Sequence, residues 1–171
     1  MRKRFFSLIE LVVVIVLLAV VAVVLLSIVI SADNRNRKLQ MNCMFGNMKE
    51  IAMALSLYGD DNRSYLPDGN NAAGLSSLLR FKYLDDSKLF VCPATLNTPA
   101  GSWQELSKET ISGNGKKDAT LHCSYLYKGG LYMNDLTPDT IVLKDKPENH
   151  KKTVQFINGS FAVQSIQVSK R

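Results

Sequence analysis

The chain has little of the chemistry from which active sites are commonly built. Its 171 residues include two histidines, one tryptophan and three cysteines. Three cysteines can form at most one disulfide within the chain, and no CxxC pair gives them the spacing of a strong zinc site. No nucleophile-elbow motif surrounds a cysteine, and no internal repeat is present. A hydrolase that combines Cys92 or Cys123 with His122 or His150 therefore has no local support.

Proline and glycine are absent before Gly46, and charge is absent between Leu11 and Ile30. These twenty apolar residues form about 30 Å of helix, which is the thickness of the hydrocarbon core of a bilayer. A cleaved secretory signal has a shorter apolar run and a small-residue cleavage site. A buried helix of a water-soluble protein would need apolar partners on every side, and residues 33–171 are too few to provide them. The run therefore predicts a transmembrane helix.

Basic residues lie on both sides of this apolar run. Arg2, Lys3 and Arg4 precede it, and Arg35, Arg37 and Lys38 follow it, partly offset by Asp33. The count alone favours a cytoplasmic N terminus only slightly. Because the N-terminal side is short and a whole domain follows, we expect a single pass with the C-terminal domain outside.

The net charge of +6 is spread over the chain. Basic clusters occur at Lys116-Lys117, from Lys144 to Lys152 and at Lys170-Arg171. Clusters of this size are usually a solvated face. No specific nucleic-acid partner is predicted.

One carboxylate, Glu10, lies near the start of the apolar run. A charge in hydrocarbon is costly, so such residues are usually functional. The order Phe6-Ser7-Leu8-Ile9-Glu10-Leu11 behind a basic tail resembles the N-terminal segment of type IV pilins and type II secretion pseudopilins. Further segments resemble the pilin-like proteins of planctomycete and lentisphaere-type bacteria: Cys43 to Ile51, Tyr58 to Asn62, Tyr65-Leu66-Pro67, Phe90-Val91-Cys92-Pro93, and His150 to Gly159.

The resemblance implies a structural subunit rather than an enzyme. A prepilin peptidase would cut between Phe5 and Phe6, and the new amino group of Phe6 would be methylated. Phe5 stands where the family normally has glycine. Glu10 would then neutralise the amino group of a neighbouring subunit and set the register between them.

The same resemblance implies the location and the partners. The subunit would be held in the inner membrane, with its domain in the periplasm or on an extracellular filament. Its partners would be identical or related pilin subunits, the prepilin peptidase, membrane lipid and a secretion or pilus platform. Pilus and secretion pseudopilus both stay open. The rival interpretation is a monomeric membrane-anchored binding module outside the membrane.

The chain divides into four predicted regions. Residues 1–5 are a cytoplasmic leader, 6–32 a transmembrane and assembly helix, 33–58 an amphipathic continuation and 59–171 an extracytoplasmic domain. In the continuation, apolar residues recur at helical spacing, which predicts one face packed on the domain. That stripe comprises Met41, Met44, Phe45, Met48, Ile51, Ala52, Leu55 and Tyr58. Gly46 is a candidate bend, and Gly59 is expected to end the helix.

The domain reads as a short helix followed mainly by strands. We expect a helix over 75–83, an extended piece over 88–92 and an irregular region over 95–117, with Trp103 pinning that region or lying in a helical turn. Strands are predicted at 123–127 and 140–144, and a hairpin joins 153–157 to 160–166 through a two-residue Asn158-Gly159 turn. The predicted fold is α+β and pilin-like, with a long N-terminal helix packed on a small antiparallel sheet.

Two smaller expectations concern cross-links and ions. Outside the membrane a disulfide is permitted, and Cys92 with Cys123 is the preferred pair, with Cys43 and Cys92 as the alternative. No cofactor is predicted. Asp60, Asp61, Asn62, Asp68, Asn70 and Asn71 gather in one stretch. Turn formation explains that stretch better than calcium, because no glutamate closes an EF-hand loop.

Overall fold

The computed structural model describes residues 8–109, 121–146 and 153–167. Two compact units make up the chain, Met1–Lys38 and Leu39–Arg171. The predicted cleavage position at Phe5 and Phe6 lies outside the described residues, as does His150.

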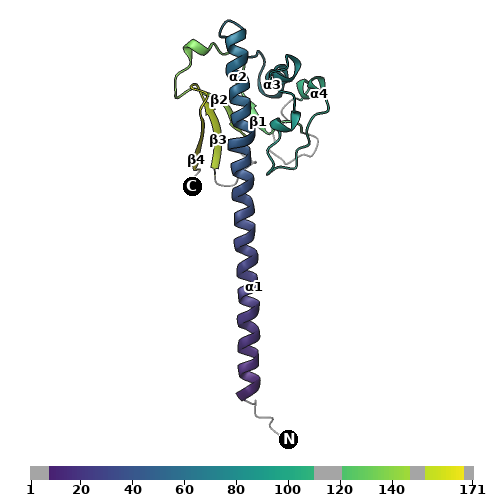
Figure 1. Cartoon of the computed structure of the whole chain (residues 1–171), viewed down its shortest axis with the longest axis vertical. Helices are drawn as coiled ribbons and strands as arrows, with labels where there is room; N and C mark the ends of the chain where they lie inside the picture. Colours follow the sequence, from purple (N-terminus) through teal and green to yellow (C-terminus); the bar gives the residue numbers. More distant parts are fainter. Residues whose placement is uncertain (1–7, 110–120, 147–152, 168–171) are drawn as a thin grey trace. The chain divides into compact units, whose positions relative to one another are not determined.

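The first unit consists, in its described part, of helix α1 (Leu8–Met41), which ends just inside the second unit (Figure 1). Its sequence contains neither glycine nor proline, so nothing in it interrupts the backbone ladder. The helical state continues without a gap through η1 (Asn42–Met48) and α2 (Lys49–Asp61). This confirms the helix predicted from Phe6 to Tyr58 over its described part.

The second unit opens with a local departure from the α-helix, because η1 is a π-helix. In a π-helix the hydrogen bonds run from residue i to i+5, so residues five apart share a face. Cys43 and Met48 are five apart and both fully buried, whereas Met41 and Phe45 are each 54% exposed. The expectation that Met41 and Phe45 face the core is therefore wrong. Gly46, the candidate bend, lies within this π-helical turn.

Helix α2 buries Ile51, Ala52 and Leu55 of the predicted stripe, and Tyr58 is partly buried against the core. The prediction that the helix ends at Gly59 is wrong, because α2 continues to Asp61. Gly59 lies inside the helix, where the Met133 side chain packs against it, and a Cβ there would require that side chain to move. The left-handed positions that follow the helix are taken by Arg63 and Ser64.

Three short helices follow. Helix α3 (Asn71–Arg80) begins earlier than predicted. The 3₁₀ helix η2 (Ser87–Phe90) replaces the predicted extended piece, because the Asp86 carboxylate accepts the Lys88 amide at 2.8 Å and caps a helical turn. Helix α4 (Trp103–Ser107) is capped by the Ser102 hydroxyl and confirms the helical turn at Trp103.

Four strands form one antiparallel sheet in the order β1-β2-β3-β4. They are β1 (Tyr125–Tyr127), β2 (Ile141–Asp145), β3 (Thr153–Asn158) and β4 (Val163–Gln167). The short helix η3 (Met133–Asp135) lies between β1 and β2. All four strands overlap the predicted ones.

The hairpin turn between β3 and β4 is longer than predicted. The backbone N–H of Asn158 donates a hydrogen bond to the Ala162 carbonyl at 3.1 Å, and Ile157 pairs with Val163 in the sheet. The buried Asn158 side chain accepts the amides of Ser160 and Ala162, so it closes a four-residue loop. The positive φ of 56° falls on Phe161 rather than on Gly159.

The core of the second unit lies among α2, α3 and the sheet. In Figure 1 strands β2, β3 and β4 lie on one side of α2, and β1, α3 and α4 lie on the other. The largest fully buried side chains come from all of these elements: Met48, Ile51, Leu55, Leu75, Leu78, Phe90, Tyr125, Leu143 and Ile157. The α+β class, with a long N-terminal helix followed by a small antiparallel sheet, is confirmed.

Candidate functional site

Helix α1 exposes an apolar surface along its length. Every large apolar side chain from Leu8 to Ile30 is exposed, from 43% at Val14 to 80% at Leu8. Water-soluble proteins rarely show continuous apolar patches of this extent. Within the described residues, one helix is long and apolar enough to cross a membrane, Leu8–Leu39. This apolar surface of α1 is therefore suited to contact with lipid or with other apolar helices, and not with water.

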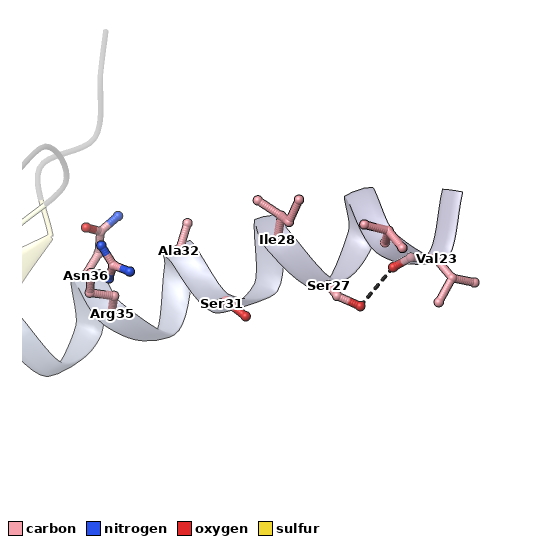
Figure 2. Close-up of a pocket in the computed structure, with 8 residues that line it drawn as sticks. Val23, Ser27, Ile28, Ser31, Ala32, Arg35 and Asn36 are labelled. Atoms are coloured by element: carbon pink, nitrogen blue, oxygen red, sulfur yellow. Dashed lines mark hydrogen bonds between the residues drawn. The ribbon is translucent and has the colours of Figure 1, made fainter. Parts of the chain in front are cut away.

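The hydroxyl within this apolar helix is satisfied locally. Ser27 Oγ donates to the Val23 carbonyl at 2.8 Å, one turn earlier on the same helix (Figure 2). A hydroxyl bonded in this way costs little in an apolar environment. Among the described residues, the hollow in Figure 2 is lined by α1 alone, from Val23 to Asn36, so it is an open surface of one helix.

Charged side chains mark the far end of the apolar run. Arg37 Nε lies 3.1 Å from Asp33 Oδ2, and both side chains are well exposed. Exposed pairs at this helical spacing contribute only a few tenths of a kcal/mol, so the pair is solvated surface. Arg35 and Lys38 are exposed on the same stretch.

Glu10 lies in the first described turn of α1. It is the only ionisable side chain from Leu8 to Ile30. A carboxylate is favoured at this end of a helix by the helix dipole. What such a carboxylate can do chemically is to bind a cation at the start of an apolar surface.

The preferred disulfide, Cys92 with Cys123, is wrong, and the alternative pair of Cys43 and Cys92 is the one that forms. Cys92 is bonded to Cys43, with their Cα atoms 5.2 Å apart. The π-helical turn places Cys43 in the core, and the Asn47 side chain holds this turn to the Val91 carbonyl at 2.7 Å. The Cys92 backbone N–H donates a hydrogen bond to the Ser124 hydroxyl at 2.9 Å, so Cys92 contacts Ser124, the residue that follows Cys123. Cys123 is a free, buried thiol.

Cys123 cannot act as a ready nucleophile. Burial raises the pKa of its thiol to about 12, so it stays protonated at neutral pH. With Cys92 oxidised, neither cysteine offers the thiolate that a Cys–His hydrolase needs. The His122 ring instead contacts the Thr98 carbonyl at 2.9 Å and a Glu105 carboxylate oxygen at 3.2 Å.

We expect native protein to take up no iodoacetamide at pH 8. After denaturation without a reductant, one cysteine should react, and peptide mapping should find the label on Cys123. The reason is that Cys43 and Cys92 are bonded and Cys123 is fully buried. Label on Cys43, or rapid labelling of the native protein, would contradict this arrangement.

The acidic stretch serves as a set of structural contacts. Asp61 accepts the Tyr83 hydroxyl at 2.9 Å, and the Asn62 side chain donates to the Tyr58 carbonyl at 2.7 Å. Asn70 and Asn71 accept the amides of Gly129 and Tyr127, which ties the start of α3 to β1. Over residues 8–109, 121–146 and 153–167, no three His, Cys, Asp or Glu side chains gather to hold a metal ion. Calcium binding stays an untested alternative.

A buried ion pair is the feature that sequence reasoning missed. Lys146 Nζ lies 3.3 Å from Glu109 Oε1, and each side chain is only 5% exposed. The Lys146 ammonium also donates to the Cys123 carbonyl, and the other Glu109 oxygen accepts the His122 amide at 2.7 Å. The prediction that Lys146 belongs to a solvated basic face is wrong. Nothing in its spacing distinguished it from Lys144, which is exposed.

Comparisons of the chain with known protein families, with curated proteins and with solved structures gave no match.

Proposed function

We propose that the chain is a pilin or pseudopilin subunit, held in a membrane by α1 and assembled into a filament. One observation carries the proposal: the exposed apolar part of α1, from Leu8 to Ile30, has a single carboxylate, Glu10, near its start. Anchoring alone needs only the apolar residues. A carboxylate in a membrane helix is usually functional, and the amino terminus of a second copy is a cation that Glu10 would bind.

Two further observations support the proposal. The helical state continues from Leu8 to Asp61 without a gap, so the apolar segment and α2 belong to one run of helix. The domain then buries the last part of this helical segment in its core. In lipid, helix packing would supply cohesion between copies, and Glu10 would supply their register.

We expect Glu10→Ala and Glu10→Gln to lower the yield of sedimentable filaments at least tenfold, and Glu10→Asp to retain a measurable part of it. The cause is the loss of the counter-charge, which a shorter carboxylate partly restores. Filaments are sheared from cells, pelleted and imaged by electron microscopy. Ser27→Ala is the matched control, because its hydroxyl bonds only its own helix in the structure.

Two checks separate this function from its rival. Resistance to carbonate extraction must be equal for all variants, so that lost assembly is not lost insertion. The mass of the N-terminal peptide from assembled protein should correspond to a chain that starts at methylated Phe6. A monomeric anchored binding module predicts instead that Glu10→Ala changes nothing and that Arg2 to Phe5 are retained.

A further inference from the structure

A groove of about 540 Å³ follows the outer side of α2, where it meets the segment after α3. Met53 and Leu57, one turn apart, line its floor and are 64% and 52% exposed. Tyr83 and Leu84 line the other side. The groove thus offers apolar surface to a partner without being a closed cavity.

Carboxylates lie toward both ends of this groove. Glu50 and Asp60 line it, and their separation of ten residues corresponds to about 15 Å along α2. Asp61 follows directly and is bonded to Tyr83, which holds a third carboxylate beside it. Among the described residues that line the groove there is no basic side chain. Lys82, nearby in sequence, lies 4.0 Å from Asp85.

The chain itself carries a segment of complementary chemistry. Arg35, Arg37 and Lys38 are exposed on α1, next to the apolar run, with Asp33 as the one acidic residue among them. Long basic side chains lay their methylene stems along apolar surface while their charged ends reach carboxylates. If the basic side chains laid their methylene stems over Met53 and Leu57, their charged ends could reach the acidic residues. They would then match both the apolar surface of the groove and its carboxylates.

We propose that this groove binds the basic segment Arg35–Lys38 of a second copy. The inference rests on the proposed function and names one contact within that assembly. The two surfaces are different, so the contact is heterologous and repeats from copy to copy instead of closing a symmetric pair. Exposed ion pairs are individually weak, and repetition of the contact from copy to copy along a filament would let many of them act together.

Cysteine cross-linking between full-length copies in cells that assemble filaments tests the contact. One tagged copy carries Arg35→Cys and a second, differently tagged copy carries Asp60→Cys, so no link can form within one chain. The native cysteines do not interfere, because two are bonded and Cys123 is buried. Asp135→Cys is the matched control, since Asp135 is an exposed aspartate of η3 outside the groove.

We expect at least fivefold more mixed dimer from the 35/60 pair than from the 35/135 pair. Charge reversal provides the second readout. Glu50→Lys with Asp60→Lys on one copy should lower its co-purification with the other copy at least fivefold, and Arg35→Glu with Arg37→Glu on the other copy should restore it.

Equal cross-linking of the two pairs overturns the inference, as does a charge reversal without effect or without rescue. Cross-linking of Asp60→Cys to a different membrane protein, with no mixed dimer, overturns it in favour of a foreign basic partner. Sedimentation of wild-type filaments is followed in parallel. If filaments form and depend on Glu10 while the 35/60 link is absent, this contact fails and the proposed function stands. If no filaments form, the proposed function fails as well.

Discussion

Replacing Lys146 with methionine is expected to lower the free energy of unfolding by about 3–5 kcal/mol. The change removes the cation that lies 3.3 Å from Glu109 and leaves a carboxylate that is 5% exposed without it. Methionine fills a similar volume, so the effect comes from charge rather than from a cavity. Chemical denaturation of the full chain in detergent, followed by the fluorescence of the single tryptophan, measures it.

Two variants control this experiment. Adding Glu109→Gln to Lys146→Met should recover most of the loss, because the amide oxygen still accepts the His122 amide and no charge stays buried. Lys82→Met should change stability by about 0.5 kcal/mol or less, since its pair with Asp85 is exposed. A double variant as unstable as the single one would show that the lysine stem, and not the ion pair, matters.

Cys43→Ser is expected to lower the stability of the second unit by about 2–4 kcal/mol, and its Tm by about 10 °C. The disulfide closes a loop with a sequence separation of 49 residues, so its loss frees a long segment of the unfolded chain. Thermal denaturation with and without reductant measures the effect. Reductant should bring the wild type close to the variant and leave the variant unchanged. A variant that reductant destabilises further would contradict the pairing.

The sequence predicted those elements that follow from regular patterns. The apolar run formed a continuous helix, and the stripe through Ile51 and Leu55, which repeats with the helical period, is buried. Residues 153–157 formed a strand as predicted, but burial in β3 does not alternate, since Gln155 to Asn158 are all buried. Glu10 was identifiable for a related reason, because one carboxylate in an apolar helix stands out whatever the fold.

The failures come from contacts between segments far apart in the sequence. Phe45 was placed on the wrong face because periodicity assumes an α-helix, and the π-helical turn shifts the phase. Gly59 predicts a helix end, yet it lies inside α2 with the Met133 side chain packed against it. Lys146 and the pairing of Cys92 depend on which segments the tertiary fold brings together, which spacing along the chain does not specify.

The position of the disulfide determines how the second unit bears mechanical load. A pull between the first unit and the C-terminal strand enters at Leu39 and reaches Cys43 four residues later. There the covalent bond carries tension directly to Cys92, so the segment between the two cysteines lies off the load path. Helices α2 and α3 belong to that segment. They cannot be drawn out while the bond is intact, and extension is confined to the residues before Cys43 and after Cys92.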